Sequence, residues 1–228
     1  ADVLTRRDEG MNGASAGPVD WYERRLFQDH FFAKGTTVEQ LVAGTYPELG
    51  DFILQPFEMT QMRQTGSRLT LSLRRDGGLY RVGTRLPCLL EKTYAIDAAS
   101  GLVEVSYQIT NTGKLPLEAV FAAEMNLNLG ADQSGRAVWN FGETKKSDRD
   151  RWQGEALSRV VAGSTDGLEV TMSSEDLPLV WGYPILDVEK GPEGPIRQGN
   201  CVLFGKHLDL KPGQKAEARL KITFRKKE

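Results

Sequence analysis

Residues 103–110 read VEVSYQIT, a stretch in which apolar and polar side chains alternate at every position. Val103, Val105, Tyr107 and Ile109 would share one face of an extended chain, with the polar residues on the other face. This alternation is the pattern of a half-buried β-strand. The same pattern recurs in three further stretches, 69–74, 121–129 and 216–224.

Turn signals separate the alternating stretches. Asn111-Thr112-Gly113 ends the first one, and Asp166-Gly167 stands between Val160-Val161 and the alternating run 168–172, which predicts a β-hairpin. No comparable helical period is visible, and no internal repeat of fixed length suggests a propeller or solenoid. We therefore predict an all-β fold, a large antiparallel β-sandwich.

The chain has 228 residues, enough for one sizeable β domain. Residues 1–20 are mostly small and polar, and we interpret them as a flexible leader or linker. Residues 21–228 then form the predicted sandwich. Its first segment, WYERRLFQDHFF (21–32), has apolar residues at mixed spacing, and we interpret it as a short helical or irregular segment attached to a sheet.

The formal net charge is -2, and no long run of one charge sign appears before the short basic stretch Arg225-Lys226-Lys227, so we expect no nucleic-acid partner. No apolar stretch approaches the roughly 18 residues that span a bilayer, so we expect no membrane association. The first ten residues lack the apolar centre of a secretory signal. Cys88 and Cys201 are the only cysteines, and we expect both to be reduced and buried, as in a cytoplasmic protein.

The sequence lacks the motifs of a self-contained active site. It contains no G-x-S-x-G elbow, P-loop, H-E-x-x-H or C-x-x-C. His30 and His207 are the only histidines, which leaves too few ligands for an ordinary zinc site. We therefore assign no catalytic residue and expect neither a metal nor another cofactor.

Two short segments carry candidate polar contacts. Asp29-His30 lies among aromatic residues, where a histidine beside a carboxylate can act as a tuned base. The more common alternative is that both residues satisfy buried hydrogen bonds. In Glu48-Leu49-Gly50-Asp51 the two carboxylates could meet a hydroxyl-rich ligand, or Asp51 could bond its own backbone in a turn.

A third candidate is the polar face of residues 121–129. Glu124, Asn126 and Asn128 share that face, which is either a solvated outer surface or a concave one where carboxylate and amide groups meet sugar hydroxyls. We predict the concave surface. Stacking platforms for sugar rings, unless they are buried, could come from three indoles: Trp139, Trp152 and Trp181.

Five segments occur in an order that resembles one known type of domain: YERRLFQDHFF, YPELGDFILQPF, VEVSYQITNTG, FAAEMNLNLG and WGYPILDVEKGPEGPIRQGNCVLF. They are similar to the C-terminal β-sandwich of glycoside hydrolase family 57 enzymes, the α-amylase and 4-α-glucanotransferase group. The resemblance runs from about Trp21 to Phe224 and implies a galactose-mutarotase-like supersandwich.

In that family, a (β/α)7 barrel carries the two carboxylates of a retaining mechanism. The present sequence shows no barrel pattern, so the resemblance implies an accessory domain that supports or extends a site for an α-glucan or maltooligosaccharide. Lys190-Gly191-Pro192 departs from the family's more serine-rich pattern, and no sugar contact is carried over to that loop. The candidate sugar-binding residues are Asp29, His30, Glu48, Asp51, Glu124 and Asn126.

Two alternatives remain open. The chain could be a sugar-acting enzyme of the aldose-epimerase type, which needs an acid and a base on opposite sides of a ring carbon. It could also be a structural module whose concave face packs against a protein partner.

Overall fold

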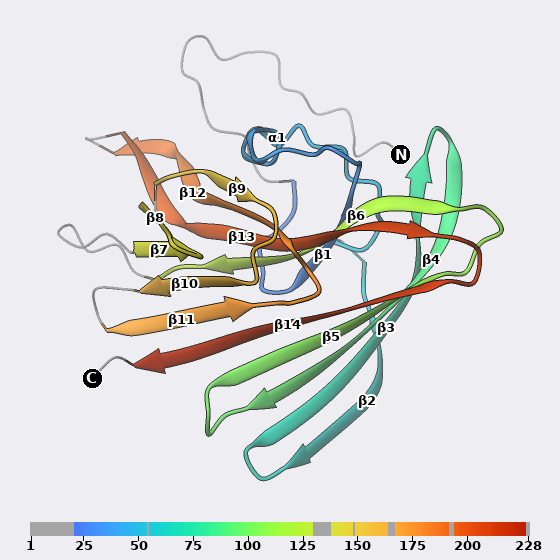
Figure 1. Cartoon of the computed structure of the whole chain (residues 1–228), viewed down its shortest axis with the longest axis horizontal. Helices are drawn as coiled ribbons and strands as arrows, with labels where there is room; N and C mark the ends of the chain where they lie inside the picture. The colour runs from blue at the N-terminus through green and yellow to red at the C-terminus, as the bar shows by residue number, and fades with distance from the viewer. Residues whose placement is uncertain are drawn as a thin grey trace.

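The computed structural model describes residues 21–53, 55–129, 138–147, 149–163, 167–191 and 194–226, the side chains of 187–191 and 194–196 excepted. The predicted leader, residues 1–20, lies outside these described residues. In the described part, two antiparallel sheets pack face to face, and the helix α1 (Val38–Ala43) lies beyond the smaller sheet (Figure 1). The predicted antiparallel β-sandwich is confirmed.

The smaller sheet has five strands. In spatial order they are β1 (Gln28–Phe32), β6 (Leu117–Leu127), β13 (Gly194–Leu210), β12 (Leu179–Gly191) and β9 (Trp152–Gly154).

The larger sheet has nine strands. In spatial order they are β2 (Glu58–Thr65), β3 (Arg68–Arg81), β4 (Thr84–Asp97), β5 (Leu102–Asn111), β14 (Lys215–Lys226), β11 (Leu168–Ser173), β10 (Arg159–Gly163), β7 (Val138–Phe141) and β8 (Thr144–Ser147).

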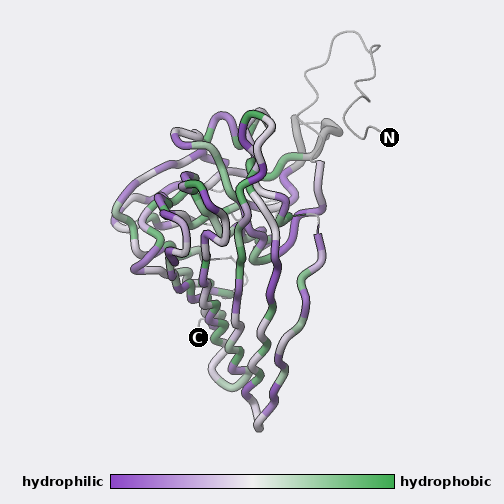
Figure 2. Tube along the Cα trace, turned by 90° about the vertical axis from the view of Figure 1, so that its right-hand side faces the viewer, coloured by the Kyte–Doolittle hydropathy of each residue, from purple (hydrophilic) through white to green (hydrophobic). Residues whose placement is uncertain are grey.

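The two-residue period of the sequence matches the burial of the strands. In β5, Val105, Tyr107 and Ile109 are buried between the sheets, and the polar residues between them lie on the opposite face. Polar and apolar residues alternate along the strands in the same way in Figure 2. The predicted hairpin is also present, because β10 pairs antiparallel with β11, and Val160 lies opposite Met172.

The interpretation of residues 21–32 as a short helical or irregular segment is corrected in part. Residues 21–27 are irregular, as one of the two interpretations had it, but Gln28–Phe32 forms strand β1, which pairs with β6. The strand was missed because Asp29 to Phe32 are all buried, which removes the alternation that marks a half-exposed strand. Its outer face is covered as fully as its inner face.

The core has two parts. The larger cluster fills the space between the sheets and includes Phe31, Tyr107 and Phe121. A second cluster covers the outer face of the five-stranded sheet, where α1 packs with Val38 and Leu41. Both cysteines are buried and free, as expected. Among the described residues, none of the helical segments has the length and apolar character of a bilayer span.

Phe121 tests the packing between the sheets. Its ring is 0% exposed and lies 5.4 Å from that of Phe31 and 5.1 Å from that of Tyr107, measured between centroids. Phe121→Ala should lower the free energy of unfolding in urea by about 3–5 kcal/mol, since it leaves a cavity. Leu115→Ala is the control: Leu115 is 54% exposed, so its loss should cost less than about 0.5 kcal/mol. Equal effects would contradict this description of the core.

Candidate functional site

Strand β1 directs its two candidate residues to opposite sides of the five-stranded sheet. His30 lies opposite Ala122 of β6 on the outer face, where Ala122 belongs to the second apolar cluster. Asp29 lies opposite Ala123, which belongs to the core between the sheets. The two residues are therefore neighbours in sequence but do not form one site, because successive side chains of a strand alternate between its faces.

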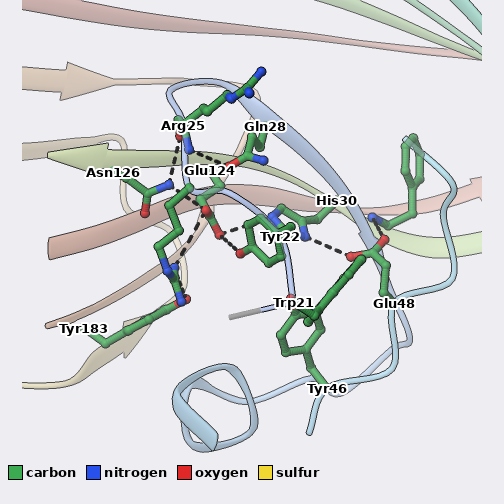
Figure 3. Close-up of polar contacts among 12 residues, drawn as sticks. Trp21, Tyr22, Arg25, Gln28, His30, Tyr46, Glu48, Glu124, Asn126 and Tyr183 are labelled. Carbon is green, nitrogen blue, oxygen red and sulfur yellow. Dashed lines mark hydrogen bonds and ion pairs between the residues drawn. The ribbon is translucent and has the colours of Figure 1, made fainter. Parts of the chain in front are cut away.

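Glu124 of β6 is the centre of the cluster on the outer face (Figure 3). Its Oε2 accepts a hydrogen bond from the Tyr22 hydroxyl at 2.7 Å and lies 3.2 Å from Nε2 of His30. Its Oε1 accepts a hydrogen bond from the Asn126 amide at 2.6 Å, and Arg24 lies 3.8 Å away. The carboxylate is 1% exposed and is surrounded by polar partners.

Glu48 contacts the other nitrogen of the same imidazole. Helix α1 is followed by Gly44 in the left-handed conformation (φ 64°), and the chain then returns alongside β1. Oε2 of Glu48 lies 2.8 Å from Nδ1 of His30, and its Oε1 accepts the backbone N–H of Phe31 at 2.8 Å. His30, which is 0% exposed, is thus held between two carboxylates.

These contacts shift the pKa values of both partners. Burial alone would lower the pKa of His30, but the contacts with Glu124 and Glu48 outweigh it and raise the pKa to about 9. Burial would raise the pKa of Glu124, but His30 and Arg24 lower it to about 2. At neutral pH the cluster therefore holds an imidazolium and an ionised Glu124, the charge states that favour a stable ion pair.

An irregular segment, residues 21–25, covers the cluster. The Tyr22 ring meets the His30 ring edge-on at 5.6 Å, and Arg24 donates to the Tyr183 hydroxyl at 3.2 Å. Trp21, which is 49% exposed, donates its indole N–H to the hydroxyl of Tyr46. The cluster thus attaches the segment to the sheet and leaves the Glu124 carboxylate without an open face.

Asp29 forms a separate ion pair between the sheets. Its Oδ2 lies 2.5 Å from Nζ of Lys92, which also donates to the backbone carbonyl of Phe27 at 3.1 Å. Burial would lower the pKa of Lys92, but the Asp29 carboxylate raises it above its ordinary value, so the ammonium group stays charged. Asp29 is 2% exposed and joins the two sheets.

Asp51 lies at a third location, where it contacts strand β3. It accepts the backbone N–H of Gly78 at 3.1 Å and lies 3.3 Å from the Arg75 guanidinium, both on β3. This contact attaches the loop after Glu48 to the larger sheet. Asp51 therefore bonds the backbone of β3, where one of the two interpretations from sequence had a bond within its own turn.

The predicted polar stripe does not line an open concave surface at Glu124, because residues 21–25 cover that carboxylate. Asn126 is partly buried and also donates to the backbone carbonyl of Arg25 at 2.8 Å, while Asn128 is exposed. Trp139 and Trp181 are 2% and 3% exposed, so neither offers its face to a sugar. Trp152 is partly buried and stacks on Phe141 at 4.3 Å.

Comparison with known families shows which family the chain belongs to. Residues 17–219 match the model of the family described as alpha-amylase/4-alpha-glucanotransferase, C-terminal. The chain belongs to this family. The match covers all the residues of the Glu124 cluster, so the cluster lies within the family domain.

Two comparisons concern Thermococcus litoralis. Its curated 4-alpha-glucanotransferase is 31% identical over 108 residues, which are 47% of this chain and 15% of that protein. A solved structure of 4-alpha-glucanotransferase from the same organism has a TM-score of 0.66 at 21% identity, over 90% of this chain and 28% of that one. The family domain described here thus corresponds to less than a third of the length of these relatives.

A galactose mutarotase related enzyme from Lactobacillus acidophilus shares the fold. Its solved structure has a TM-score of 0.52 at 12% identity, over 88% of this chain and 80% of that one. This likeness confirms the expected galactose-mutarotase-like architecture.

The prediction from sequence missed three residues that complete the cluster, namely Tyr22, Arg24 and Tyr183. All three lie in segments that carry the family resemblance, YERR and WGYP, but the sequence does not indicate which contacts they make. Tyr22 and Glu124 are separated by 102 positions in the sequence. No local pattern brings such positions together.

We expect the cluster to make stability depend on pH. Because the pKa of His30 is raised from 6.5 to about 9 in the folded chain, its contribution is fully present below about pH 6.5 and is lost as the pH rises through about 9. Urea unfolding between pH 6 and 9.5 should show this decline, and His30→Gln should flatten it. His207→Gln, which replaces an exposed histidine, should keep the decline. An unchanged slope in His30→Gln would contradict the charged imidazolium.

Tyr22→Phe should loosen the covering segment. The change removes a hydrogen bond to a buried carboxylate, which should cost about 1.5–3 kcal/mol in the free energy of unfolding. Trypsin should then cut faster after Arg24 and Arg25. Tyr80→Phe is the matched control, because Tyr80 is 51% exposed. Wild-type stability and cleavage rate in Tyr22→Phe would show that the hydroxyl does not hold the segment.

Proposed function

We propose that this chain acts as a non-catalytic β-sandwich domain of an α-glucan-acting protein, where it supports or extends a glucan site. The observation that carries this proposal is that the carboxylates of the Glu124 cluster are enclosed and bound to protein partners. The carboxylates that most resemble a catalytic pair, Glu48 and Glu124, contact opposite nitrogens of one buried imidazole. Their oxygens are used to hold the chain together.

Glycoside cleavage makes a different demand on two carboxylates. They must face a sugar from both sides, with one protonated as an acid and the other ionised, and with space for the substrate between them. Here His30 occupies that space, and Glu124 stays ionised because its pKa is lowered to about 2. A group whose pKa lies that low does not deliver a proton near pH 7.

The cluster holds residues 21–25 in a fixed position on the sandwich. It fixes where this segment meets the sandwich, through Tyr22, Arg24 and the backbone of Arg25. This chain covers 28% of the Thermococcus litoralis 4-alpha-glucanotransferase structure. We infer that the catalytic carboxylates reside in a partner part of such a protein, a barrel domain that acts on an α-glucan or maltooligosaccharide.

The aldose-epimerase alternative has support from the shared fold, but the geometry at His30 disfavours it. An epimerase needs an imidazole or carboxylate that reaches the sugar ring and titrates near the working pH. His30 is 0% exposed and its pKa is raised to about 9. Fold likeness alone does not carry an activity.

We expect the 228-residue chain to release no reducing sugar from starch and to transfer no glucosyl units between maltooligosaccharides. The reason is that its paired carboxylates are enclosed and bound to His30. Product analysis by chromatography after long incubation would measure both reactions. Glu124→Gln serves as the comparison. Turnover by the wild-type chain that disappears in Glu124→Gln would overturn the non-catalytic assignment and favour a stand-alone enzyme.

A further inference from the structure

The outer face of the nine-stranded sheet contains a hollow of about 540 Å³. It lies over β4, β5 and β14, on the sheet that does not carry the Glu124 cluster. We call it the furrow and define it by six side chains: Glu91, Thr93, Ser106, Gln108, Glu217 and Arg219. Asp176, in the connection between β11 and β12, also lines it.

Strand register explains why the sheet is hollowed here. Thr93 lies opposite Ser106, and Ser106 lies opposite Arg219, so short hydroxyl side chains from β4 and β5 meet at neighbouring positions. The next row on the same face is longer: Gln108 lies between Glu91 and Glu217. Short side chains beside a row of long ones leave a depression across the strands.

Several polar groups in the furrow have no protein partner. Within the described part of the chain, the side chains of Glu91, Ser106 and Arg219 form neither a hydrogen bond nor an ion pair. Gln108 does have partners, since it donates to Glu217 at 3.2 Å and accepts from Lys215 at 2.7 Å. Exposed bonds of this kind exchange readily with water or with a ligand.

The chemistry of the furrow suits a neutral, hydroxyl-rich chain. Carboxylates accept hydrogen bonds from sugar hydroxyls, a guanidinium donates to them, and serine, threonine and glutamine do both. The three carboxylates of Glu91, Asp176 and Glu217 would repel a phosphate or another anion. Glu217 and Arg219 are exposed, so the furrow is open to solvent along β14.

We propose that the furrow binds an α-glucan segment, at a site separate from the Glu124 cluster. The choice of α-glucan rests on the proposed function, and the location rests on the furrow itself. Tyr107 lines the furrow but is 2% exposed and has its ring in the core, so no stacking platform adds to the affinity. Binding through hydrogen bonds that replace those of water should be weak, with Kd of about 0.1–1 mM.

Titration of the 228-residue chain with maltoheptaose, followed by NMR chemical shifts or calorimetry, tests the site. Saturable binding with shifts centred on β4, β5 and β14 is expected. Ser106→Gln should fill the furrow and raise Kd at least about tenfold. Glu91→Gln, which keeps the shape and removes a charge, should weaken binding less. Thr65→Gln, at the far end of β2 on the same sheet, is the matched control and should bind as wild type does.

The outcomes separate this proposal from the proposed function. Binding that Ser106→Gln and Glu91→Gln leave unchanged would overturn the furrow as the site, while the non-catalytic assignment would stand. Absence of saturable binding up to about 20 mM, far above the expected Kd, would also overturn it. Equal binding of cellohexaose would contradict the choice of an α-linked glucan. The turnover assay, by contrast, bears only on the proposed function.

Discussion

A buried imidazolium between two carboxylates joins three segments of this chain. His30 comes from β1, Glu124 from β6 and Glu48 from the loop that follows α1. Burying charged groups away from water costs free energy unless each charge is paired. Removing one partner of a buried ion pair destabilises the fold more than replacing both partners by apolar residues. The charges are paired here only when β1 is in register with β6 and the loop has returned alongside β1. The ion pairs therefore specify one arrangement of these segments, and the covering residues 21–25 are held by the same carboxylate through Tyr22.

The same principle applies between the sheets. Asp29 and Lys92 form a second buried ion pair that joins β1 to β4, and Lys92 also holds the carbonyl of Phe27, whose backbone has a positive φ of 60°. Strand β1 is thus fixed by charge on both of its faces. This explains how a strand of five residues at the edge of the smaller sheet can carry so many buried polar groups.

These structural uses of charge bear on function. In the sequence, a histidine with acidic neighbours suggests catalysis. In the structure, these side chains bind one another and stabilise the fold. The polar side chains of the furrow lie on the opposite sheet, on a face that an ordinary solvated strand pattern also produces. In this protein, reactive residue types therefore indicate a ligand site less well than polar atoms that lack a hydrogen-bond partner.

The sequence by itself determined the fold class, because a strand's side chains alternate with a period of two that any short stretch displays. VEVSYQIT and the hairpin around Gly167 show it directly, and the family resemblance followed from the order of such segments. The sequence also brought His30, Glu48, Glu124 and Asn126 forward as polar candidates. It could not say that the first three share one imidazole-centred cluster, that Asp29 points away from it, or that Tyr22 covers it. Those facts depend on register and on contacts between positions as far as 102 residues apart, which only the packing of the two sheets decides.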